Sequence, residues 1–127
     1  MSIEGKKKIL MVDDEPALTR VVKLNLERTG RYEVRTENSG TNAVTAAREF
    51  DPDLVLLDII MPDIEGSYVA AQFKEDAQLA GIPIVFFTAA ASKEDVQKQG
   101  GIIGDYPFIA KPASLDQIIE AIERYAA

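Results

Sequence analysis

The sequence predicts an α/β fold, a doubly wound five-stranded parallel sheet with five helices. Short apolar runs alternate with stretches of helical periodicity from end to end, and together they make five strand–helix units. A hydrophobic content of 46% is enough for one core without disulfides. No linker, repeat or low-complexity segment interrupts the sequence, so we expect a single domain over 1–127 with no output domain.

The first two units occupy the N-terminal part of the chain. The apolar run 7–13 predicts a strand, and the helix that starts after Pro16 should end at Gly30. Residues 32–37 alternate between apolar and charged side chains, as a half-exposed strand does, and Ser39 should cap the next helix. The apolar stripes of these helices are Leu18, Val21, Val22 and Leu26, and Ala43, Ala46, Ala47 and Phe50.

Three further units follow. Residues 53–58 and 82–88 predict two buried strands, and 106–110 predicts the last strand. The helices after these strands are expected over 66–76, over 92–100 and from Ser114 onward, with capping boxes at Ser92 with Asp95 and at Ser114 with Gln117.

The character of each strand indicates its place in the sheet. The first, third and fourth runs are apolar throughout and need cover on both faces, whereas the second alternates. The fifth carries Pro107, which cannot donate a ladder hydrogen bond, so the second and fifth strands should lie at the edges. This pattern is compatible with the flavodoxin-like order 2-1-3-4-5, in which the ligand crevice lies at the carboxyl ends of strands one and three.

Composition excludes several classes of function. Cysteine and histidine are absent, which removes thiol nucleophiles, the commonest general base and the usual zinc ligands. A net charge of −7 argues against direct binding of nucleic acid, and the lysines at 6–8 are expected to be a solvated edge. No stretch approaches the ~18 apolar residues of a membrane span, so we expect a cytoplasmic protein without membrane insertion.

Acidic residues gather where two neighbouring strands are expected to end. Asp13 and Asp14 close the first strand and Asp58 closes the third. At about 4 Å and an effective dielectric near 20, each like-charged pair costs on the order of 4 kcal/mol, which a divalent cation would offset. Since all the ligands are oxygens, Mg²⁺ suits this site. The alternative for Asp13 and Asp14 is a plain helix start beside Pro16.

Two further polar residues end strands on the same rim. Thr88 closes the fourth strand and Lys111 closes the fifth. Each has an ordinary explanation alone, as a loop cap or as a surface lysine. Together with Asp58 they predict a phosphoryl site with an aspartate nucleophile, a metal ion and two donors for the phosphoryl oxygens.

These residues belong to a recognisable set of motifs. The set is Asp13-Asp14, Asp58, Met61-Pro62, Gly66, Thr88-Ala89 and Lys111-Pro112. In this order and spacing it resembles the receiver domain of two-component response regulators, over essentially the whole chain. The resemblance implies that Asp58 is the phosphoacceptor, and that Thr88 and Lys111 hold the phosphoryl group. It also implies Mg²⁺ bound by Asp13, Asp14, Asp58 and the backbone carbonyl of Ile60, and a cis peptide bond before Pro112.

The resemblance also implies partners and dynamics. The phosphoryl group would come from a sensor histidine kinase or a histidine phosphotransfer protein, and an unknown downstream protein would read the output surface, so the chain is not itself an enzyme. The position matching the family's switch aromatic is Phe108, which is otherwise an ordinary core phenylalanine. Ile60 and Ala90 stand where many receivers carry acid or amide side chains, so we expect slow self-dephosphorylation. The segment 92–105 should be weakly anchored, and its Ile102 and Ile103 either cap the core or bind a partner.

Two other classes remain open. One is a phosphate-independent interaction module with a vestigial site, which would leave the carboxylates unpaired at a cost. The other is a small phosphohydrolase with an aspartate nucleophile, but such enzymes carry a second aspartate two residues later, where this chain has Ile60.

Overall fold

The structure is a computed structural model, and it describes residues 5–89, 102–103 and 106–126. The strands are β1 (Lys7–Val12), β2 (Tyr32–Glu37), β3 (Leu54–Leu57), β4 (Ile84–Thr88), β5 (Ile102–Ile103) and β6 (Tyr106–Ala110). The helices are α1 (Pro16–Arg28), the 3₁₀ helix η1 (Gly40–Asn42), α2 (Ala43–Phe50), α3 (Gly66–Glu75) and α5 (Leu115–Tyr125). The helix expected over 92–100 lies outside the described residues.

The sheet has the predicted parallel topology. Its order is β2-β1-β3-β4-β6-β5, and each neighbouring pair from β2 to β6 is parallel, which confirms the flavodoxin-like order. The short strand β5 was not predicted. It pairs antiparallel with β6, with Ile102 opposite Pro107, so β6 does not form the edge as expected. Only two residues pair there, and Pro107 still lacks the N–H that a longer ladder would use.

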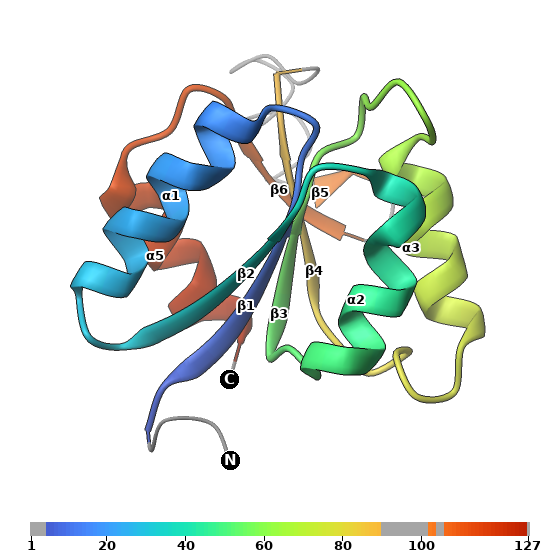
Figure 1. Ribbon diagram of the computed structural model, residues 1–127, viewed down its shortest axis with the longest axis horizontal. Coiled ribbons are helices and arrows are strands. Elements are labelled where there is room, and N and C mark those ends of the chain that lie inside the picture. The colour runs from blue at the N-terminus through green and yellow to red at the C-terminus, as the bar shows by residue number, and fades with distance from the viewer. Residues whose placement is uncertain (1–4, 90–101, 104–105, 127) are drawn as a thin grey trace.

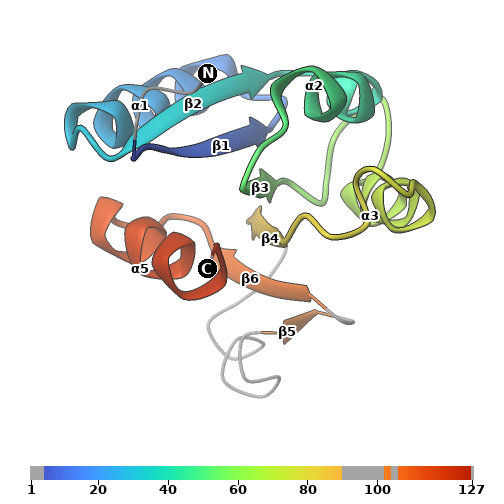
Figure 2. The same ribbon diagram turned by 90° about the horizontal axis from the view of Figure 1, so that it is seen from below.

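The helices cover both faces of this sheet. Figure 1 shows α1 and α5 on one side of the sheet and α2 and α3 on the other. Figure 2, turned by 90°, shows the same two pairs of helices on either side of the strands. Neighbouring residues on a strand serve opposite cores, as pleating requires. In β1, Ile9 and Met11 pack toward α1 and α5, whereas Leu10 and Val12 pack toward α2 and α3. Both faces of the central strands are therefore buried.

Several local predictions can be checked in the helices. Gly30 has a positive φ of 76° just after α1, as its role as a helix stop requires. The capping box at α5 is present, because Ser114 Oγ accepts from the Gln117 backbone N–H and the Gln117 side chain accepts from the Ser114 backbone N–H. Val21 is 54% exposed, although its spacing placed it in the buried stripe, because it lies on the flank of α1.

The expected cap of the second helix was wrong. Ser39 precedes η1, and α2 begins only at Ala43. Its hydroxyl donates to Asp63 Oδ2 at 2.6 Å, in the loop after β3, and the Asp63 carboxylate takes the place of the Ser39 oxygen as the acceptor for the backbone N–H groups of this turn. The backbone N–H of Thr41 donates to the same carboxylate oxygen at 3.0 Å. Asp63 therefore ties the loop after β2 to the loop after β3.

In the part of the chain that the structure describes, we find no helix with the length and apolar character needed to cross a membrane.

Candidate functional site

The three predicted carboxylates meet at the carboxyl ends of β1 and β3. Asp13 and Asp14 follow β1, and Asp58 follows β3. The strand ladder continues one residue past the strands, because the Asp58 N–H donates to Val12 O and the Asp13 N–H donates to Glu37 O, both at 3.0 Å. One carboxylate oxygen from each of the three aspartates lies within 4.8 Å of the others. The parallel register therefore brings together residues that are 45 positions apart in the chain.

Two of these aspartates are buried. Asp13 is 1% exposed and Asp58 is 5% exposed, whereas Asp14 is partly exposed. Burial is the largest influence on Asp58 and raises the pKa of its carboxyl, while the Lys111 charge lowers that pKa and the Asp13 charge raises it. A buried carboxylate beside another carboxylate is disfavoured unless cations balance it.

Lys111 supplies the positive charge at the site. It follows β6, where its N–H donates to Thr88 O at 2.9 Å, and its peptide bond to Pro112 is cis, as predicted. Its Nζ donates to Asp13 Oδ2 at 2.6 Å and lies 3.7 Å from Asp58 Oδ2. Burial alone would lower the pKa of Lys111, but the hydrogen bond and the nearby carboxylates raise that pKa above its usual value. The ammonium stays charged at neutral pH.

Thr88 and Ile60 complete the predicted set. Thr88 is fully buried at the end of β4, and its hydrogen bond to Asp58 lowers the pKa of that carboxyl. The backbone N–H of Ile60 donates to Asp58 Oδ1 at 3.4 Å, while the Ile60 side chain is 65% exposed. All the site residues predicted from the sequence therefore lie around Asp58, and Ala90 lies outside the described residues.

Gly66 sets the distance between α3 and the Asp58 loop. Its N–H donates to Ile59 O at 2.7 Å, which anchors the first turn of α3 under the loop. A Cβ at this position would overlap the Asp58 carbonyl oxygen and would lie 2.8 Å from the Ile59 Cα. Only glycine permits this close approach.

Two residues around the site were missed from the sequence. Asn38, just after β2, donates from Nδ2 to Asp13 O at 2.8 Å and to Thr19 Oγ1 at 3.0 Å, which fixes the backbone of Asp13. Its position at the carboxyl end of the strand next to β1 was the available signal. Glu15 lies with one carboxylate oxygen 3.5 Å from Lys111 Nζ. No role was predicted for it from the sequence.

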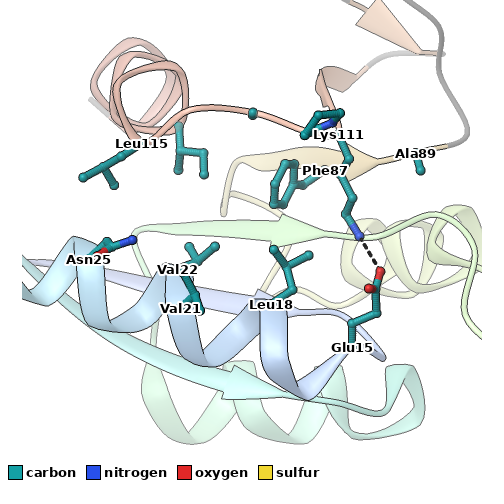
Figure 3. Close-up of a pocket in the computed structure, with 12 residues that line it drawn as sticks. Glu15, Leu18, Val21, Val22, Asn25, Phe87, Ala89, Lys111 and Leu115 are labelled. Carbon is teal, nitrogen blue, oxygen red and sulfur yellow. Dashed lines mark hydrogen bonds and ion pairs between the residues drawn. The ribbon is translucent and has the colours of Figure 1, made fainter.

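A pocket of about 450 Å³ adjoins the site between α1 and α5 (Figure 3). Its walls are mainly apolar, with Leu18, Val22 and Phe87 among them, and Glu15 and Lys111 stand at one end. The Lys111 ammonium also lies 5.4 Å from the centre of the Phe87 ring. The pocket and the acidic site therefore share one wall.

The donor set decides which metal fits. Three carboxylates and one lysine leave an excess of negative charge, and all the candidate ligand atoms are oxygens. Hard divalent cations with oxygen ligands suit such a site, whereas zinc and copper prefer nitrogen or sulfur. The residues present fit Mg²⁺, and they also place one buried carboxylate, that of Asp58, beside an ammonium and a hydroxyl.

Comparisons with known proteins identify one family. The family model described as "Response regulator receiver domain" matches residues 9–123. The chain is similar to the polar-differentiation response regulator DivK of Brucella ovis, with 36% identity over 94% of this chain and 95% of the relative. A solved N-terminal domain of a response regulator receiver protein from Methanoculleus marisnigri is 37% identical with a TM-score of 0.68, covering 93% of this chain and 94% of that one. The chemotaxis protein CheY4 of Vibrio cholerae is 26% identical with a TM-score of 0.79, covering 94% and 98%.

The model match spans nearly all of the chain, and these relatives are covered over almost their full length. Receiver domains of this family act as phosphoacceptors in two-component signalling, and they receive their phosphoryl groups from donors such as histidine kinases. The chain belongs to the response regulator receiver domain family.

Proposed function

We propose that this protein accepts a phosphoryl group on Asp58, from the phosphohistidine of a sensor histidine kinase or a histidine phosphotransfer protein. The observation that carries the proposal is the convergence of three carboxylates within 4.8 Å, with Lys111 Nζ 3.7 Å from Asp58. Phosphorylation would change the output surface that an unknown downstream protein reads. The domain is a signalling switch of the cytoplasm, not an enzyme that turns over a substrate.

Asp58 is the nucleophile. One of its carboxylate oxygens attacks the phosphorus of the donor, an O–P bond forms, and the P–N bond to the donor imidazole breaks, with the electron pair left on the imidazole nitrogen. The chain has no histidine, so the imidazole that leaves belongs to the donor, and its nitrogen takes up a proton from solvent. The receiver needs no general base of its own, because the carboxylate already carries the attacking charge.

The neighbours of Asp58 position and neutralise the transferring group. Lys111 offers an ammonium and Thr88 a hydroxyl to the phosphoryl oxygens, and the ends of the strands fix where each of these side chains begins. The ligands for Mg²⁺ would be Asp13, Asp14, Asp58 and the backbone carbonyl of Ile60. When bound, the ion supplies positive charge that offsets the charge of the phosphoryl group.

Phe108 is the candidate for carrying the change outward. It is 6% exposed and pairs across the sheet with Phe86, two residues before Thr88. Both belong to the core on the α2 and α3 side of the sheet. Because phenylalanine has no hydroxyl, its two positions would differ in packing alone.

The test is the mass of the intact protein after incubation with Mg²⁺ and acetyl phosphate. We expect one phosphate adduct on the wild-type chain and none on Asp58→Ala. Asp51→Ala is the matched control, since Asp51 is an exposed aspartate just before β3, and it should take up phosphate normally. An adduct that persists in Asp58→Ala would contradict the assignment.

A folded protein that takes up no phosphate from acetyl phosphate or from a kinase would favour the phosphate-independent module instead. The phosphohydrolase alternative is not favoured by any observation. The position two residues after Asp58, where such an enzyme carries its acid–base aspartate, holds the exposed apolar side chain of Ile60.

A further inference from the structure

Glu15 brings a fourth carboxylate to the edge of the acidic site. It immediately precedes α1 and its side chain is 64% exposed. Its Oε1 lies 3.5 Å from Lys111 Nζ, a contact drawn as a dashed line in Figure 3. Lys111 therefore faces three carboxylates in this structure, those of Asp13, Glu15 and Asp58.

The Glu15 side chain does not cap α1. The Glu15 backbone makes hydrogen bonds at the start of this helix, because its N–H donates to Asp13 Oδ1 at 3.0 Å and its carbonyl accepts from the Thr19 N–H at 3.1 Å. Among the described residues, the Glu15 side chain makes no capping hydrogen bond, and glutamate is not among the residues favoured at this position. The side chain reaches toward Lys111 instead.

The three carboxylates around Lys111 are not equivalent. Asp58 is the proposed phosphoacceptor and Asp13 is a proposed metal ligand, whereas Glu15 has neither role. The Lys111 ammonium lies 2.6 Å from Asp13, 3.5 Å from Glu15 and 3.7 Å from Asp58. A phosphoryl group on Asp58 would add new acceptor oxygens on that side of the ammonium, and the Glu15 carboxylate competes with them for it.

We propose that Glu15 is a positioning residue that holds the Lys111 ammonium back from Asp58 and thereby slows phosphorylation. This inference rests on the proposed function of Asp58 and Lys111. The restraint is weak and reversible, because the Glu15 carboxylate is largely exposed and its ion pair is screened by solvent and salt. Since Glu15 also lines the apolar pocket, its contact with Lys111 is reachable from outside the site.

The test uses Glu15→Gln, which keeps the size of the side chain and both backbone hydrogen bonds. The initial rate of phosphorylation by acetyl phosphate in Mg²⁺ is measured by intact mass at low and at high salt. Glu120→Gln is the matched control, because it removes the same charge from an exposed position on α5. Glu15→Ala serves as a second variant, and thermal unfolding confirms that each variant is folded.

We expect Glu15→Gln and Glu15→Ala to be phosphorylated about two- to fivefold faster than wild type at low salt, the size expected for competition with a mostly exposed ion pair. The difference should shrink at high salt, and Glu120→Gln should match wild type throughout. A purely structural role for Glu15 would not produce this dependence on salt.

Three results would overturn the inference: no acceleration in either Glu15 variant, an equal acceleration in Glu120→Gln, or a difference that persists at high salt. A wild-type chain that takes up no phosphate at all would overturn the proposed function itself, and the two failures are therefore distinguishable.

Discussion

Replacing Gly66 by alanine tests the link between the start of α3 and the loop that carries Asp58, the proposed phosphoacceptor. The new Cβ would overlap the carbonyl oxygen of Asp58 and would lie 2.8 Å from the Ile59 Cα and 2.9 Å from the Asp58 carbonyl carbon. All three neighbours are backbone atoms, which cannot rotate away as a side chain could. Relief requires α3 to move away from the loop, and the hydrogen bond from Gly66 N–H to Ile59 O, now 2.7 Å, is then lost.

The expected cost is about 3 kcal/mol in the free energy of unfolding. Overpacking a well-packed site costs about 1–3 kcal/mol, and the lost backbone hydrogen bond adds about 1 kcal/mol. Urea unfolding followed by circular dichroism measures this change, with the midpoint falling and the slope unchanged. The displaced loop carries Asp58, so the rate of phosphorylation by acetyl phosphate should fall as well.

Gly81→Ala is the matched control. Gly81 lies in an exposed turn, no described atom would lie within 4 Å of its new Cβ, and its φ is not positive. This variant should be as stable as wild type or slightly more stable, because alanine reduces the conformational freedom of the unfolded chain. If Gly66→Ala unfolds within about 0.5 kcal/mol of wild type, the close approach does not constrain the loop and the reasoning is refuted.

Three further predictions follow from the structure. Burial and the hydrogen bond to Glu123 raise the pKa of Tyr32 to about 12, so its contribution to stability is full below its ordinary pKa of 10.0 and is lost as pH rises toward 12. The difference in tyrosinate absorbance between wild type and Tyr32→Phe, followed against pH, measures the pKa of Tyr32, and a midpoint near 10 would contradict the prediction. Hydrogen bonds from Ser39 and from nearby backbone N–H groups lower the pKa of Asp63 to about 2, so its contribution to stability is present above its ordinary pKa and is lost as pH falls toward 2. Acid unfolding of Asp63→Asn should lack this pH-dependent loss of stability, which is under about 1 kcal/mol because the group is exposed. The phosphate adduct should decay slowly in Mg²⁺, since the exposed Ile60 side chain cannot orient a water molecule. The adduct on Ile60→Gln should decay faster, and loss of the wild-type adduct within seconds would disprove the prediction.

Most of the fold could be predicted from the sequence, because the residue pattern of each strand indicates whether one or both of its faces are buried. The run 54–57 is apolar on both faces and is typical of a central strand, whereas the alternation in 32–37 requires one partly exposed face. The aspartates at the strand ends then followed from parallel topology, since carboxyl ends share one rim. Asp58, Thr88 and Lys111 were located without any knowledge of side-chain contacts.

What escaped prediction depends on tertiary contacts that leave no periodic pattern. Ser39 has the right spacing for a helix cap, but the Asp63 carboxylate, from a loop far along the chain, accepts from the backbone N–H groups that the cap would satisfy. Val21 fits the buried stripe by number, yet its exposure depends on how far α1 stands from α5. No pattern in the sequence singled out Glu15, and only the position of Lys111 reveals its contact.

At this site the backbone fixes where the side chains begin, and the flexibility of each side chain decides where its charged group lies. Asp13, Asp58 and Lys111 each follow a strand by one residue, and each backbone N–H donates to the strand beside it, at 2.9–3.0 Å. These bonds fix where the side chains begin, so the spacing of the two buried carboxylates is a property of the sheet. The ammonium of Lys111 is different, because it ends a long flexible side chain with several acceptors in reach. We therefore expect the acceptor that holds this ammonium to control the proposed phosphorylation, and among the described carboxylates around it that of Glu15 is the most exposed to solvent.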